Sequence, residues 1–412
     1  MKILFINKYD VSGGAAIAAW RLHERLESSC GTEDAFLVGI KRSPSGKVHL
    51  TRRPGFESIM ERGINLLLNK AGLQYVWFPF STGRIRRFAA AFKPDIIALQ
   101  NIHGGYFQTT LVAELSSLAP VVWTLHDMWA FTGNAAYTFG DERWKQLRGG
   151  KGERRHFPAI GLETGHLLLK RKQKIYAGSR LTVVCPSRWL QRLAQQSPVF
   201  AGKLIKWIPN GIDTAFFCPP ENKSAAKTAL GIAPDRKVLL LSAEKLLKSD
   251  YKGGRDLLEI LKLLDHAAWG EITLLTLGHD PLPASYTHLQ VKSMGYISEE
   301  RQILQALQAS DVYLHTARAD NLPNTLIEAI SCGVPCIAFD VGGCGEIVRD
   351  GENGCLIAPF DHALFADRVQ YLLRNTQVHE QFSGNASRIA RENFDLQMMS
   401  RRYFELFKAL LA

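Results

Sequence analysis

Short apolar runs alternate along this chain with longer stretches in which apolar residues recur every three or four positions. The short runs are typical of buried strands, and the recurring pattern is typical of amphipathic helices. Strands are predicted at residues 2–7, 36–40, 95–99, 120–125, 181–185, 204–208, 237–241, 272–277, 311–315 and 335–339. Helices are predicted at residues 15–28, 56–72, 84–92, 107–118, 165–178, 187–196, 223–230, 253–264, 299–309, 324–332, 361–374 and 394–411. This alternation predicts an α/β protein with parallel sheets.

The alternation stops and restarts around Ile208-Pro-Asn-Gly-Ile-Asp213. A Pro-Asn-Gly turn between apolar residues is typical of a chain that crosses from one domain to the next. The length of 412 residues also favours two or three domains, each with its own core. We therefore predict one domain over residues 1–207 and a second over residues 208–393.

Charge is divided unevenly between the two halves of the chain. Residues 1–207 hold 30 Lys and Arg against 14 Asp and Glu, whereas residues 208–412 hold 20 against 25. The net charge of +11 therefore comes from the first half. This asymmetry predicts an anionic ligand or surface that meets one domain only.

Two amphipathic helices of the basic half, predicted at 56–72 and 84–92, allow two interpretations. Their apolar faces can dock on the sheet, which is the interpretation we favour. Alternatively, a membrane-facing basic patch is formed by Arg84, Arg86, Arg87 and Lys93.

Cysteine usage and hydropathy bear on the cellular compartment. Seven scattered cysteines without a C-x-x-C pair favour buried thiols of a cytosolic protein over a disulfide or zinc framework. No apolar run reaches the roughly 18–20 residues of a membrane-spanning helix. We therefore expect a cytoplasmic protein, with peripheral attachment to the inner face of the cytoplasmic membrane as an alternative. The loop 141–157, rich in Gly, Lys and Arg, holds no cysteine that could order it.

The stretch from Ala317 to Phe339 carries the most informative chemistry. A loop with Asp320 follows a predicted strand and leads into a short helix that contains Glu328. Ligands of parallel sheets bind beyond the carboxyl ends of the strands. Backbone amides around Asn324 and Thr325 suit a phosphate, and a nearby carboxylate can accept hydrogen bonds from sugar or ribose hydroxyls. The stretch has the outline of a nucleotide-sugar pocket, although an ordinary βαβ turn would fit the same pattern.

Three lysines flank the turn after the predicted strand 237–241. They are Lys245, Lys248 and Lys252, and Lys252-Gly-Gly opens the next helix. Ammonium groups and helix-start amides can together clamp a diphosphate. At least one of the three is expected to be only a solvated surface lysine.

Two candidate positions lie after strands of the first half. His126 follows the strand 120–125 and could bond a sugar hydroxyl or support developing charge. The adjacent Asp127 could equally cap a helix. Gly13 and Gly14 form part of a dinucleotide fingerprint whose third Gly is missing, so a tight strand-to-helix turn explains them as well.

Asp320-x7-Glu328, followed by Ala329-Ile330-x-Cys332-Gly333-x-Pro335, resembles the acidic pair and following helix of the family 4 glycosyltransferases. These are retaining enzymes of the GT-B fold, in which two Rossmann-like domains with parallel sheets face each other across a cleft. The stretch Asp320–Thr325, with Asp in place of the usual Glu, resembles a branch that builds exopolysaccharides of the colanic-acid type. Ile208–Asp213 and Lys252-Gly253 resemble further family motifs in the same order. The Arg that the family places near residue 243 is missing.

The resemblance implies roles for individual residues. In the second domain Glu328 would bind the ribose, Asp320 the sugar, and Lys252 the leaving diphosphate. The rest of the expected donor site comprises Lys245, Lys248, Tyr296, Asn321, Leu322, Asn324 and Thr325. In the first domain His126 would contact the transferred sugar. The acceptor side of the cleft would include Gly13, Gly14, Asp127 and Asn210. The final helix, residues 394–412, is expected to pack back on the first domain.

The function so implied is that of a retaining hexosyltransferase. It would move a hexose from a UDP- or GDP-sugar to a glycan or lipid-linked acceptor in exopolysaccharide or lipopolysaccharide biosynthesis. No D-x-D follows a strand in the manner of metal-dependent glycosyltransferases of the other large fold, so neither a metal nor a cofactor is expected. Another GT-B enzyme such as a nucleotide-sugar epimerase, a sugar-nucleotide sensor and a basic nucleic-acid-binding protein remain alternatives. The sequence has no motif of interleaved aromatic and basic residues that would support nucleic-acid binding, so we expect no nucleic-acid partner.

Overall fold

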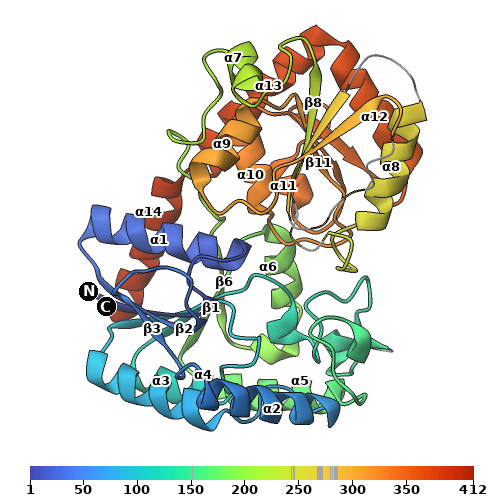
Figure 1. Cartoon of the computed structure of the whole chain (residues 1–412). Helices are drawn as coiled ribbons and strands as arrows, with labels where there is room; N and C mark the ends of the chain where they lie inside the picture. The colour runs from blue at the N-terminus through green and yellow to red at the C-terminus, as the bar shows by residue number, and fades with distance from the viewer. Residues whose placement is uncertain are drawn as a thin grey trace. The chain divides into compact units, whose positions relative to one another are not determined.

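The chain forms two compact units in a computed structural model (Figure 1). Unit 1 consists of residues 1–210 and 399–412, and unit 2 of residues 211–398. The chain therefore passes between the units twice. The described part of the structure comprises every residue except 151, 243, 245, 267–271, 279, 281 and 283–285.

Unit 1 is built on a seven-stranded parallel sheet in the order β3-β2-β1-β4-β5-β6-β7. Its strands are β1 Lys2–Tyr9, β2 Glu33–Ile40, β3 Val48–Leu50, β4 Ile96–Leu99, β5 Val121–Thr124, β6 Leu181–Cys185 and β7 Leu204–Trp207. Its helices are α1 Gly14–Cys30, α2 Phe56–Lys70, α3 Pro79–Phe92, α4 Leu111–Leu118, α5 Gly165–Ala177, α6 Arg188–Gln195 and most of α14 Leu396–Leu411. Helices α3, α4 and α5 lie on one side of the sheet, and α1 and α14 lie on the other (Figure 1).

Unit 2 is built on a six-stranded parallel sheet in the order β10-β9-β8-β11-β12-β13. Its strands are β8 Lys237–Ser242, β9 Ile272–Leu277, β10 Leu289–Ser293, β11 Val312–His315, β12 Cys336–Phe339 and β13 Gly354–Ile357. Its helices are α7 Lys223–Ala229, α8 Gly254–His266, α9 Glu300–Gln308, α10 Asn324–Ser331, α11 Cys344–Ile347, α12 His362–Arg374 and α13 Thr376–Asn393.

The continuous apolar runs of unit 2 are explained by burial on both faces of its sheet. Successive residues of β8 belong to opposite cores: Val238 and Leu240 pack with α9, α10 and α13, whereas Leu239 and Leu241 pack with α8 and α12. Side chains of a strand point alternately to the two faces, so a strand covered on both sides needs apolar residues throughout. The two parallel sheets confirm the predicted α/β class.

Three strands and two helices, the four-residue α11 and the longer α13, were not predicted. Strands β3, β10 and β13 are all edge strands, and β10 (Leu-Gln-Val-Lys-Ser) has only its first residue buried. An edge strand such as β10 buries less surface and therefore leaves a weaker apolar pattern, whereas β3 and β13 are only three and four residues long. Helix α13 is predominantly polar, with five buried residues among 18.

The loop 141–157, which has no cysteine for a disulfide or a metal site, is ordered by buried polar groups instead. The Glu153 carboxylate accepts hydrogen bonds from the backbone N–H groups of Gly133 (2.9 Å) and Gly150 (2.6 Å). The Asn134 side-chain amide donates to the carbonyls of Glu153 and Pro158, both at 3.1 Å. A side-chain carboxylate and an amide thus replace the missing disulfide or metal.

The two amphipathic helices differ in what they bury. Helix α3 docks through Ile85 and Ala89, as predicted. Helix α2 does not: its fully buried side chain is Glu61 rather than an apolar one. The preferred interpretation of an apolar face on the sheet is therefore wrong for α2. The basic patch is also partly neutralised, because Arg84 pairs with Glu57 and Arg86 with Glu114.

Helix α14 covers unit 1 over its residues from Met399 onward. The Tyr403 hydroxyl lies 2.8 Å from Thr124 Oγ1, at the end of β5, and both side chains are buried. None of the seven cysteines is in a disulfide. Within the described ranges, no helix has the length and apolar character needed to cross a bilayer.

Candidate functional site

The carboxyl end of β11 brings together the two residues of unit 2 for which the sequence predicted the most chemistry. Lys252 Nζ lies 3.1 Å from Asp320 Oδ2, and both side chains are partly buried. Asp320 Oδ1 accepts a hydrogen bond from the backbone N–H of Asn321 at 2.9 Å. His315, the last residue of β11, places its Nε2 3.8 Å from Asp320 Oδ2.

Two glycines allow the loops around Asp320 to approach backbone to backbone. Gly253 has a φ of +70°, and a Cβ there would lie 1.6 Å from the carbonyl oxygen of Thr316. Gly342 has a φ of +58°, and a Cβ there would lie 1.7 Å from the carbonyl oxygen of Asp320. Any side chain at either position would push the loops apart. The Lys252–Asp320 pair is therefore held where three loops, those of Gly253, Asp320 and Gly342, meet at the carboxyl ends of the strands.

The electrostatics of this cluster favour a charged pair beside a neutral imidazole. Burial acts to lower the pKa of Lys252, but the Asp320 charge outweighs it and the pKa is raised. Burial acts to raise the pKa of Asp320, but Lys252 and His315 outweigh it and the pKa is lowered. Burial lowers the pKa of His315 to about 4, so its ring is neutral near pH 7. His315 Nε2 is a buried polar atom without a hydrogen-bond partner in the described part of the chain.

Helix α10 starts next to this cluster. Pro323 occupies its N-cap position and no side chain caps the helix. The start of a helix is the positive end of its dipole and suits an anionic group. Glu328 is buried within α10, where its charge contributes to raising the pKa of Tyr313 after the larger effect of burial. Thr325 bonds the Tyr313 hydroxyl.

The remaining predicted donor residues have different environments. Asn321 and Leu322 are buried in the loop before α10, whereas Lys248 and Tyr296 are exposed. Lys245 lies outside the described residues.

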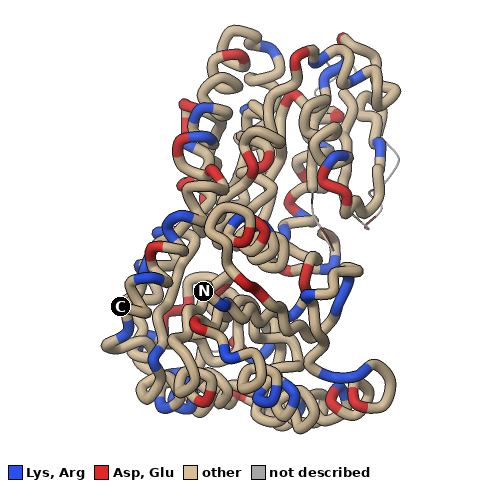
Figure 2. The backbone as a smooth tube through the Cα atoms, turned by 90° about the vertical axis from the view of Figure 1, so that its left-hand side faces the viewer, with Lys and Arg blue, Asp and Glu red and all other residues tan. Residues whose placement is uncertain are grey.

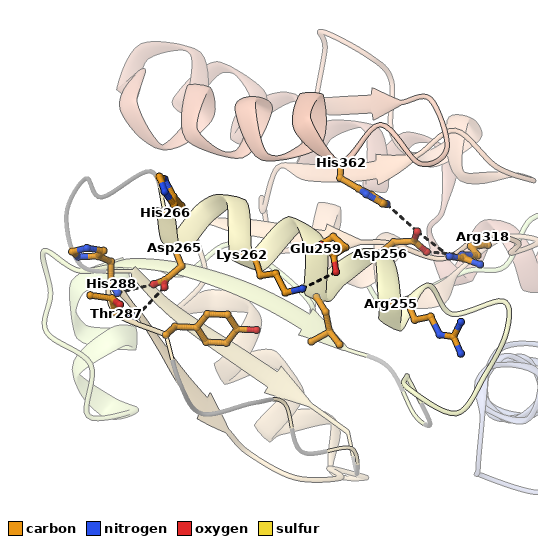
Figure 3. A pocket seen from close by; sticks show the side chains of 12 residues that line it. Arg255, Asp256, Glu259, Lys262, Asp265, His266, Thr287, His288, Arg318 and His362 are labelled. Atoms are coloured by element: carbon orange, nitrogen blue, oxygen red, sulfur yellow. Dashed lines mark hydrogen bonds and ion pairs between the residues drawn. The ribbon is translucent and has the colours of Figure 1, made fainter.

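A pocket of about 780 Å³ lies in unit 2 along α8 and is lined at one end by residues that support the cluster (Figure 3). Figure 3 shows Arg318 and His362 converging on Asp256, which is 2 % exposed. Arg318 donates two hydrogen bonds to Asp256, at 2.5 and 3.0 Å, and His362 Nε2 lies 2.9 Å from Asp256 Oδ1. The backbone N–H of Arg318 bonds the carbonyl of Tyr251 at 2.8 Å. This network joins the Asp320 loop to the Lys252 turn.

Unit 1 has its own polar cluster at the carboxyl ends of β4 and β5. His126 Nε2 lies 2.8 Å from the side-chain oxygen of Gln100, the residue that follows β4. Burial lowers the pKa of His126 to about 4, despite the opposing charge of Asp127. The imidazole is therefore neutral near pH 7 and Nε2 donates to Gln100.

Asp127 contacts both the start of a short 3₁₀ helix and a histidine of the same unit. Its Oδ1 accepts the backbone N–H of Trp129 at 2.8 Å, where a short 3₁₀ helix starts, and its Oδ2 lies 2.7 Å from His103 Nε2. His103 and Gln100 were not predicted as site residues. The signal was present, since both follow β4 as His126 follows β5.

The predicted glycine turn, Gly13-Gly14, leads from β1 into α1, and Asn210 lies where the chain leaves unit 1. Gly13 has a φ of +83° at the N-cap of α1, and its carbonyl accepts the amides of Ala16 and Ile17, both at 3.0 Å. A Cβ on Gly13 would meet nothing within 4 Å, so its backbone borders open space. Gly14 is the exposed first residue of α1. Asn210, the last residue of the first segment of unit 1, is buried.

Over the described residues, no group of three or more His, Cys, Asp or Glu is arranged to hold a metal ion.

Two family models match the chain, one in each half. The model described as Glycosyltransferase Family 4 matches residues 13–216, and the model described as Glycosyl transferases group 1 matches residues 237–375. Among relatives, the Escherichia coli protein named as colanic acid biosynthesis glycosyl transferase WcaC is 28% identical over 370 residues, covering 85% of each chain. The lipopolysaccharide core biosynthesis mannosyltransferase LpsB of Rhizobium meliloti is 26% identical over 216 residues, covering 50% of this chain and 60% of LpsB.

Solved structures show the same architecture. Anabaena HepE, in complex with UDP and glucose, has a TM-score of 0.68 at 18% identity, covering 99% of this chain and 100% of that one. WaaG, a glycosyltransferase involved in lipopolysaccharide biosynthesis, has a TM-score of 0.67 at 14% identity, covering 99% and 97%. At such identities the likeness concerns the fold alone. Together with the two family models, it shows that the chain belongs to the family 4 glycosyltransferases and has their GT-B fold.

Proposed function

We propose that this glycosyltransferase moves a hexose from a nucleotide-sugar donor to a glycan or lipid-linked acceptor, with retention at the anomeric carbon and without a metal ion. The observation that carries the proposal is the Lys252–Asp320 pair beside the uncapped start of α10. A cation and helix amides suit a diphosphate, and a carboxylate suits sugar hydroxyls. HepE, which shares the fold, binds UDP and glucose.

Asp320, Lys252 and Glu328 have separate roles in this proposal. Asp320 accepts hydrogen bonds from the sugar, and Glu328 accepts them from the ribose. Lys252 stabilises the negative charge that develops on the leaving diphosphate, which is the largest contribution expected in such a reaction. His126 is neutral and contacts the transferred sugar as a hydrogen-bond partner rather than as a cation.

The chemistry proposed is a substitution on one face of the sugar. The bond from the anomeric carbon to the donor phosphate oxygen breaks, and the acceptor oxygen forms its bond from the same side. The acceptor proton passes to the departing phosphate oxygen, so no protein base is needed. A covalent route would require a carboxylate nucleophile at the anomeric carbon, whereas Asp320 is already paired with Lys252.

The acceptor is proposed from the relatives. WcaC is named for colanic acid biosynthesis and LpsB for the lipopolysaccharide core. We place this chain in exopolysaccharide or lipopolysaccharide assembly, in the cytoplasm, with peripheral contact to the inner face of the membrane. The +16 balance of residues 1–207 (30 basic against 14 acidic) supports an anionic surface as the neighbour of unit 1.

A calorimetric titration of the full chain with UDP, GDP, ADP and TDP, in the presence of a metal chelator, tests the donor site. Selective binding of one diphosphate is expected, at least 10-fold weaker in Lys252→Ala and lost in Glu328→Ala. Lys408→Ala, which removes an exposed lysine of α14, is the matched control and should bind as wild type. Binding to none of the four would overturn the donor proposal and favour a scaffold. Turnover of donor without acceptor into an epimer would favour the epimerase alternative.

A further inference from the structure

Helix α2 exposes its apolar side chains. Phe56 is 70%, Ile59 68%, Leu66 57% and Leu67 68% exposed, and Met60 is also exposed. Positions 56, 59, 60, 66 and 67 fall on one side of an α-helix. We call these five residues the α2 apolar face. Single exposed apolar residues are ordinary, but five on one helix form a patch that requires an explanation.

The opposite side of α2 is fixed to unit 1 by polar contacts. The buried Glu61 carboxylate lies 2.9 Å from Arg52 Nη1 and accepts the Ser81 backbone N–H at 2.7 Å. Glu57 accepts the backbone N–H of Arg53 at 2.6 Å and pairs with Arg84 at 3.2 Å. Turning the helix to bury its leucines would break the buried Arg52–Glu61 pair and leave a charge without a partner. The outward direction of the apolar face is therefore specified by the sequence.

The patch continues beyond the end of the helix. Leu73 and Trp77 follow α2 and are exposed. Leu162 is 55% exposed, and its neighbour Gly161 donates its N–H to the carbonyl of Asn69 in the last turn of α2 at 2.7 Å. Trp, like Tyr, is enriched at the boundary between water and lipid.

The surroundings of the patch are basic. Residues 50–93 contain eight Lys and Arg but two acids, and both acids, Glu57 and Glu61, are engaged on the protein side of α2. Arg53, Arg62 and Lys70 are exposed beside the apolar face. Lys and Arg segments also recur along the lower edge of unit 1 in Figure 2.

We propose that the α2 apolar face, with Leu73, Trp77 and Leu162, docks on an anionic lipid bilayer. The helix is roughly 22 Å long and would lie in the plane of the interface, its apolar side chains among the acyl chains and its arginines at the lipid phosphates. A second copy of the chain fits less well, because a two-fold contact would bring Arg53, Arg62 and Lys70 against the same residues of the other copy. The proposal deepens the proposed function, since a bilayer is where a lipid-linked acceptor is found.

Co-sedimentation of the full chain with vesicles tests it. Phosphatidylcholine vesicles and vesicles with one third phosphatidylglycerol are compared at low and moderate salt. Wild type should bind the anionic vesicles at least 10-fold more tightly, with part of the binding surviving moderate salt. Ile59→Ser/Leu66→Ser/Leu67→Ser should lose at least 10-fold of that binding. The matched control, Leu118→Ser/Leu204→Ser/Leu411→Ser, removes three leucines that are exposed elsewhere and should bind as wild type.

Three results would overturn the docking proposal. The first is equal binding of the two triple variants to anionic vesicles. The second is equal binding of wild type to neutral and anionic vesicles. The third is that wild type is a dimer and that Ile59→Ser/Leu66→Ser/Leu67→Ser makes it a monomer. Nucleotide binding, measured on the same preparations, should be identical in both triple variants. If wild type binds anionic vesicles but none of the nucleotides, the proposed function is wrong and the docking proposal is unaffected.

Discussion

Lys252 Nζ and Asp320 Oδ2 lie 3.1 Å apart although the two residues are 68 positions apart in sequence. Each charge is therefore compensated before a donor arrives. A diphosphate that binds Lys252 must share the ammonium group with Asp320, so the two side chains are expected to respond to mutation in opposite directions when nucleotide affinity is measured.

Replacing Asp320 by Asn should leave UDP affinity unchanged or raise it, because the competing carboxylate charge is removed. The same variant should lose about 10- to 150-fold in turnover of the donor sugar, since a charge-assisted hydrogen bond is worth about 1.5–3 kcal/mol and the neutral amide is a poorer acceptor. Lys252→Met should weaken UDP binding instead. Calorimetry and turnover on the two variants give the comparison, and weaker UDP binding by Asp320→Asn would contradict the shared-ammonium interpretation.

The neutral state of His126 makes a prediction about pH. With a pKa of about 4, its titration should not appear in the rate between pH 6 and 8. Gln100→Glu places a carboxylate on Nε2, which should raise the pKa of His126 and charge the ring near neutral pH. We expect a new limb in the pH–rate profile of Gln100→Glu with nucleotide affinity unchanged. An unaltered profile would mean that His126 has no contact with the reacting sugar.

Stability should fall as the pH is lowered from about 6.5 to 4. The folded-state pKa values of His126 and His315 are about 4, below the ordinary value of 6.5, so the unfolded chain binds more protons over this window. Each histidine then removes up to about 1.4 kcal/mol of unfolding free energy per pH unit. Urea unfolding at pH 7 and pH 5 measures the loss. His315→Gln should reduce its pH dependence, and an identical slope in that variant would assign the loss to other groups.

Glu153 should be critical for the order of the loop around it. Glu153→Ala would leave the amides of Gly133 and Gly150 without their carboxylate acceptor, at a cost of about 1–3 kcal/mol for the buried Gly133 amide and less for the partly buried Gly150 amide. Glu153→Gln retains one acceptor oxygen and should be milder. The rate of limited proteolysis within 141–157 should be lowest in wild type, higher in Glu153→Gln and highest in Glu153→Ala. Equal cleavage rates in the three proteins would show that other contacts hold the loop.

The central strands and most helices could be predicted from sequence because burial on both faces imposes long apolar runs. Strands β3 and β13 could not, because they are only three and four residues long, and β10 could not, because most of its residues are not buried. Within the site, the acids and lysines were visible as charges in turn-like sequence, and the structure joins Lys252 to Asp320. The residues that orient them are harder to find. His315 and Asp256 have no unusual local sequence, and their contacts depend on distant segments.

The contact between Thr124 and Tyr403 spans 279 positions, and all of unit 2 lies between them. During synthesis on the ribosome, unit 2 can complete its core as soon as residue 398 has emerged. Strand β5 meanwhile has to wait for the helix that covers it, with its apolar surface exposed to chaperones and to other nascent chains. In the cell the unit that begins first is therefore the one that is completed last.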